Sequence, residues 1–141
     1  MQDSPLKTNM IIQAETSVLN LLKQIDYLLT AINRHMHATE TAGMKTASEQ
    51  IVRDNILSVV GQLRSLPYML GDMVSRWKSN SPQILSRNGV EIEILNETMA
   101  TLSATFCFML SRSIDVGEFK HAECEEAYQN LKTCNRLLTE I

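Results

Sequence analysis

Apolar residues recur at alternating spacings of three and four along most of the chain, which is the period of an α-helix and not of a strand. The first such stripe includes Ile11, Val18 and Ile25 and extends over nearly four heptads. Polar or glycine-containing stretches interrupt the periodicity three times. The periodic segments predict four helices, over residues of about 8–38, 47–78, 89–114 and 116–141.

The second predicted helix contains a proline. Its apolar stripe, which includes Leu63 and Leu70, keeps its phase across Pro67. Proline removes one helical hydrogen bond and its ring clashes with the preceding turn. We therefore expect one long helix kinked at Pro67, and two helices that meet there are the alternative.

Residues 83–94 fit two local structures. Asn88-Gly89 is typical of a hairpin turn, and apolar and acidic residues alternate after it. Asn88 and Glu91 also have the spacing of a helix capping box, and the helical stripe continues from there without a phase break. Because an isolated two-stranded hairpin is marginally stable, we favour a helix from Gly89 to Ile114 and keep the hairpin as the alternative.

Four amphipathic segments joined by short connections predict an all-α fold. A chain of 141 residues is long enough to bury a core without disulfides or metals, and no linker divides it. We expect residues 1–141 to form a single domain, an up-down-up-down four-helix bundle with coiled-coil-like packing.

Composition and charge narrow the class of partners and the compartment. The net charge of −3 argues against a dedicated nucleic-acid binder. The longest uncharged run, residues 98–111, is shorter than the roughly 17–25 residues of a membrane span. The chain has 3 cysteines without a CxxC pair, and its first residues do not resemble a signal peptide. We expect a cytoplasmic protein that binds neither membrane nor nucleic acid.

Common catalytic and cofactor motifs are missing from the sequence. It contains no Gly-rich phosphate loop, no GxSxG turn and no HExxH pair, so we expect neither an enzyme nor a bound cofactor. A phosphotransfer bundle is a weaker alternative. His37 is followed by Glu40 at the position where histidine phosphotransfer domains carry a lysine, and an acid there would repel a phosphoryl group.

Histidine and cysteine residues are expected to gather at one end of the bundle. In an up-down-up-down arrangement, the end of the first helix and the start of the fourth share that end. His35 lies in the last predicted turn of the first helix, and His121 and Cys124 lie one turn apart on the fourth. These residue types are the usual zinc donors. A ligand- or metal-binding bundle that uses His35, His121 and Cys124 is therefore the alternative function.

The third predicted helix carries more apolar residues than one core-facing stripe needs. Ile94, Thr101 and Phe108 form an outer row at a spacing of seven, and Cys107 lies on the other flank. A helix that is apolar all round is buried on two sides. We expect these four residues to form a protein interface, in a non-enzymatic adaptor or regulator that binds another protein and forms a homodimer.

Overall fold

A computed structural model gives the arrangement of these segments. It describes residues 5–41 and 88–140, and between them the positions 50, 54, 57, 60, 61, 63–65, 68–72, 75 and 78. Every described position between 50 and 78 is helical, and no described residue belongs to a strand. The all-α class predicted from the periodicity is confirmed.

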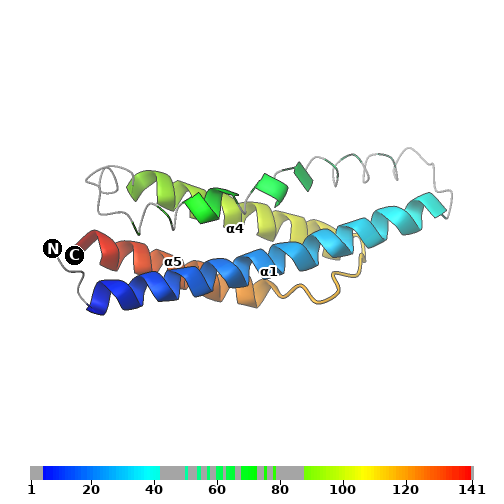
Figure 1. The fold of residues 1–141 in the computed structure, drawn as a ribbon. Helices are drawn as coiled ribbons and strands as arrows, with labels where there is room; N and C mark the ends of the chain where they lie inside the picture. The colour runs from blue at the N-terminus through cyan, green and yellow to red at the C-terminus, as the bar shows by residue number, and fades with distance from the viewer. Residues whose placement is uncertain are drawn as a thin grey trace.

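Three helices have defined bounds: α1 (Pro5–Thr41), α4 (Asn88–Ser111) and α5 (His121–Glu140) (Figure 1). The helical start at Asn88 confirms the helix over the hairpin for residues 88–94. Residues 83–87 lie outside the described residues, and so does Pro67 with its predicted kink. The first helix is longer at both ends than expected, and its first residue is a proline, whose missing N–H has no intrahelical partner there.

α5 packs along both α1 and α4. α1 and α4 run in the same direction and α5 runs opposite to both (Figure 1). Two ion pairs join α1 to the middle segment and to the connection between α4 and α5. Lys78 Nζ lies 3.2 Å from Glu15 Oε1, near the start of the helix. Arg34 Nη1 lies 3.7 Å from Asp115 Oδ2 in the connection between α4 and α5.

The predicted apolar stripes form the core. On α1, α4 and α5, fully buried side chains recur at spacings of three, four and seven, and Leu63 and Leu70 add two from the middle segment. A helix stripe buried in this way supplies most of the stability of its helix. The largest fully buried side chains are Leu21, Ile25, Leu28, Ile32, Leu63, Leu70, Leu95, Leu102, Met109 and Leu131.

α4 ends earlier than the predicted Ile114, because Ser113 adopts a left-handed backbone conformation with φ of 57°. The carbonyl of Leu110 accepts a hydrogen bond from the N–H of Ser113 at 3.0 Å. The carbonyl of Met109 accepts one from the N–H of Ile114 at 2.9 Å. These two bonds form the C-terminal cap in which a left-handed residue, usually glycine, follows the helix. Ile114 then turns back into the core.

α5 begins at His121, five residues later than predicted. Asp115 does not cap this helix, because its Oδ1 accepts a hydrogen bond from the N–H of Gly117 at 2.9 Å and forms a local turn. Gly117 itself has φ of 59°, which no right-handed helix allows. The carbonyl of Lys120 accepts the first helical bond, from Cys124 N–H at 3.4 Å, so Lys120 is the N-cap.

Substitution of Ser113 by glycine tests the cap of α4. A non-glycine residue in the left-handed region costs roughly 1 kcal/mol, so Ser113→Gly should raise the free energy of unfolding by about 0.5–1 kcal/mol. Ala100→Gly, at an exposed position inside α4, should lower it by about 1 kcal/mol. Urea denaturation of both variants measures the two changes. Equal destabilisation by both would contradict the cap.

Candidate functional site

His121, the first residue of α5, lies in the contact between α5 and α4. Its Nε2 is 2.8 Å from Ser103 Oγ and 3.8 Å from Glu125 Oε1. Its ring stacks on Phe106, with 5.2 Å between the centroids and an interplanar angle of 9°. The imidazole therefore joins the two helices through one hydrogen bond and one aromatic contact, with 27% of its side chain exposed.

Serine, histidine and glutamate together suggest a catalytic triad, but the geometry differs from one. In a triad, one imidazole nitrogen faces the serine and the other is held by the carboxylate. Here Ser103 and Glu125 both lie near Nε2 of His121. The carboxylate therefore does not hold the opposite nitrogen in place, and the arrangement suits a helix–helix contact. Sequence reasoning missed Ser103, whose position three residues before Phe106 was the available signal.

His35 is not brought to the start of α5. Gln24 Oε1 accepts a hydrogen bond from Lys120 N–H at 2.7 Å, which places the N-cap of α5 beside the middle of α1. At a rise of 1.5 Å per residue, His35 lies about 16 Å farther along the helix. Only His121 and Cys124 of the predicted set are neighbours. Among the described residues, no group of three or more His, Cys, Asp and Glu side chains could hold a metal ion.

Two of the three thiols are buried. Burial, together with the nearby carboxylates of Glu125 and Glu123, raises the pKa of Cys124 to about 12. Burial also raises the pKa of Cys134. The thiolate is the form that binds metals and attacks electrophiles. Both side chains are neutral near pH 7 and pack as small apolar groups, while Cys107 on α4 is exposed.

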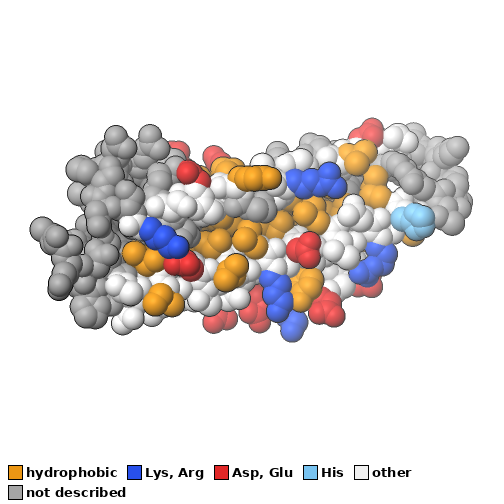
Figure 2. Space-filling model, in the orientation of Figure 1, with side chains coloured by type: hydrophobic (Ala, Val, Ile, Leu, Met, Phe, Trp, Pro, Cys, Tyr) orange, Lys and Arg blue, Asp and Glu red, His pale blue; other side chains and the backbone are white. Residues whose placement is uncertain are grey.

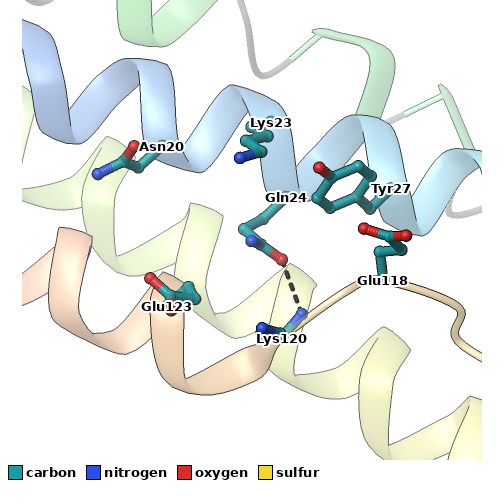
Figure 3. A pocket seen from close by; sticks show the side chains of 7 residues that line it. All are labelled: Asn20, Lys23, Gln24, Tyr27, Glu118, Lys120 and Glu123. Carbon is teal, nitrogen blue, oxygen red and sulfur yellow. Dashed lines mark hydrogen bonds between the residues drawn. The ribbon is translucent and has the colours of Figure 1, made fainter.

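A polar pocket lies where α1 meets the start of α5 (Figure 3). Its volume is about 200 Å³, below the roughly 300–1,000 Å³ and mainly apolar lining of typical ligand sites. Gln24 lines the pocket and is 6% exposed. The carboxamide oxygen faces the N-cap of α5, so the pocket is best described as a helix junction. The lining residues are Asn20, Lys23, Gln24, Tyr27, Glu118, Lys120 and Glu123.

The outer row predicted on α4 is half-buried. Ile94, Thr101 and Phe108 lie on the flank of α4 opposite Ser103, through which α4 contacts α5. Phe108 packs against the core, and the Arg112 guanidinium lies 5.8 Å from the centre of its ring. Half-burial leaves less apolar area on this flank for a partner than the sequence pattern suggested. Cys107, on the other flank, is exposed.

Larger exposed apolar side chains lie on α1 and the middle segment. Tyr68 is 83% exposed, Leu19 65% and Ile12 55%, and Leu57 and Leu110 are exposed by about half. All five lie outside the apolar stripes from which the core is predicted, and that was the sequence signal for them. Figure 2 shows hydrophobic side chains interspersed with charged ones on one face of the molecule. Apolar side chains scattered singly are ordinary on a protein surface, and a contiguous patch of them would mark a contact with another protein.

The comparisons with known proteins give no relative. No protein-family model matches the chain, and neither does any curated protein or solved structure. None of the described helices is long and apolar enough to cross a membrane. The function is therefore inferred from the chain's own residues.

The Gln24–Lys120 hydrogen bond can be removed by a single substitution. Gln24→Ala removes the side-chain oxygen that accepts a hydrogen bond from the N–H of Lys120. A backbone donor left without an acceptor costs about 1–3 kcal/mol. We expect the free energy of unfolding to fall by that amount. Gln13→Ala, an exposed glutamine on the same helix, is the matched control and should change it by less than about 0.5 kcal/mol. Equal effects would show that the contact contributes nothing.

Phe108→Asp separates a core role from an interface role on α4. Because Phe108 packs against the core, a carboxylate there should lower the free energy of unfolding by about 1–3 kcal/mol. Cys107→Asp places the same charge on an exposed neighbour and should have little effect. Chemical denaturation and light scattering are run on both variants. A fully stable Phe108→Asp variant that loses self-association would instead assign the row to an interface.

Proposed function

We propose that this protein is a non-enzymatic, cytoplasmic adaptor or regulator that binds other proteins, including a second copy of itself, through the faces of its helices. The observation that carries the proposal is the set of large apolar side chains left exposed on α1, α4 and the middle segment, Tyr68 above all. Burial of such side chains is the main favourable term in protein association, and tyrosine is enriched among the residues that dominate binding.

The helical scaffold that we propose is an up-down-up-down four-helix bundle, with the middle segment as its second helix. The antiparallel packing of α5 on α1 and α4 supports this topology. The Lys78–Glu15 ion pair also supports it, because it joins the end of the middle segment to the start of α1. Short connections between antiparallel helices are typical of such bundles.

Three of the chemistry-bearing side chains, His121, Cys124 and Cys134, have structural surroundings, which favours binding over catalysis. The His121 imidazole is stacked on Phe106 and bonded to Ser103. Cys124 and Cys134 are neutral core thiols. Catalytic acids, bases and nucleophiles usually line a cleft, whereas these groups lie between packed helices.

Self-association is tested by the mass in solution. Light scattering of the wild-type protein from about 1 to 100 µM, the range typical of weak homodimers, should show a mass that rises from one chain of 15.9 kDa to two. Growth without a plateau at two chains would indicate non-specific aggregation. A mass of one chain over the whole range would contradict the self-association in the proposal.

A further inference from the structure

The helix junction uses only half of the Gln24 carboxamide. Its Oε1 accepts the hydrogen bond from the N–H of Lys120. Because a backbone N–H is a donor, the oxygen has to face it, and the amide nitrogen Nε2 points the other way. Figure 3 shows Nε2 turned into the pocket, toward the space between Asn20 and Glu123.

Nε2 of Gln24 has no acceptor within the described part of the chain, where the hydrogen bond of this side chain is the one through Oε1. Only 6% of Gln24 is exposed. Polar groups of side chains buried to this degree are nearly always hydrogen-bonded. The acceptor for Nε2 therefore has to belong to a molecule inside the pocket.

The wall of the pocket carries two positive and two negative side chains. Lys23 and Lys120 supply the ammonium groups, and Glu118 and Glu123 supply the carboxylates. All four are exposed, and the ion pairs found among the described residues involve none of them. In the view of Figure 3, Lys23 lies on one side of Gln24 and Lys120 on the other. The four charges are thus available to a ligand.

The balance of these charges selects the class of ligand. A simple anion would be attracted by two ammonium groups and repelled by two carboxylates, and the reverse holds for a simple cation. A molecule that carries one ammonium group and one carboxylate can place each beside the opposite charge. Free α-amino acids carry both groups on one carbon atom, which suits a pocket whose opposite charges lie close together.

The size of the pocket favours the same class. Its volume of about 200 Å³ is too small for the drug-sized molecules that fill sites of roughly 300–1,000 Å³. A single water takes about 30 Å³ of liquid volume, so the pocket has room for more than one water. A free amino acid falls between these two limits.

We propose that this pocket binds a free α-amino acid. The carboxylate of the ligand accepts a hydrogen bond from Gln24 Nε2 and faces Lys120, and its ammonium group faces Glu123. Since Gln24 belongs to α1 and Glu123 to α5, the bound ligand joins the two helices and stabilises the folded protein. The inference goes beyond the proposed function, which concerns protein partners, and does not depend on self-association.

Binding is measured by thermal unfolding with each common L-amino acid at about 10 mM or its solubility limit, at constant ionic strength. At least one of them should raise the Tm by roughly 2 °C or more. Acetate and ethylammonium chloride, which carry one charge each, should have no such effect. Isothermal titration calorimetry with the amino acid that gives the largest shift then measures the Kd and the number of ligands per chain.

Three substitutions locate the ligand. Gln24→Glu keeps an oxygen for the N–H of Lys120 but replaces the donor Nε2 with an acceptor. Lys120→Gln and Glu123→Gln each remove one charge at an exposed position, so the fold should be retained, which circular dichroism checks. Each of the three should raise the Kd at least roughly tenfold, as expected for loss of a charge-assisted contact. Glu126→Gln, at an exposed position of α5 outside the pocket, is the matched control and should leave the Kd unchanged.

The outcomes separate this inference from the proposed function. An amino acid whose binding is weakened in Glu123→Gln and kept in Glu126→Gln supports the site. The inference is overturned if no amino acid changes the Tm or gives heat in the titration, or if acetate or ethylammonium has an equal effect. An amino acid that binds all three pocket variants as tightly as the wild type also overturns it. Light scattering without ligand tests self-association separately, so either proposal can fail while the other stands.

Discussion

A backbone N–H at the start of a helix needs an acceptor, and at the start of α5 that acceptor is the side chain of Gln24. The next residue, His121, is held from the other side by Ser103 and Phe106 of α4. Two consecutive residues therefore attach the first turn of α5 to two different helices. This attachment fixes the position along α1 at which α5 starts to pack, and the regular rise of the α-helix then fixes the positions of the later residues of α5. The later apolar residues of α5, such as Leu131, then fall against the core.

The parts of the fold that depend on periodicity could be predicted from the sequence. A residue such as Leu21 or Leu102 is buried because it belongs to an apolar stripe, and such a stripe is stable only when it packs against another helix. The ends of α4 and α5 could not be predicted in the same way. They depend on the backbone conformation of Ser113 and on an acceptor from a distant part of the chain. Ser113 is a polar residue where the spacing of Leu102, Phe106 and Met109 places the next apolar one, and that was a local signal of the helix end.

The candidate sites were harder to predict because they depend on how the helices are aligned along one another and on which side chains other segments bury. His35 and His121 share an end of the bundle only if α5 starts level with the end of α1, and it starts beside Gln24 instead. The apolar count of α4 indicated surplus surface but could not tell which flank other residues would cover. Phe108 is half-buried, while Tyr68, one tyrosine beside a proline in the sequence, is almost fully exposed.

The two buried cysteines of α5 allow the local opening of this helix to be measured at two positions. Cys124 lies in the first turn and Cys134 ten residues later, about 15 Å along the helix. Each thiol is shielded from reagents and also kept protonated by its surroundings. Opening of the surrounding helices would remove both forms of protection at once, so the rate of cysteine alkylation measures how often the helices open. The relative labelling rates of the two thiols therefore record whether the two halves of α5 detach together or one after the other.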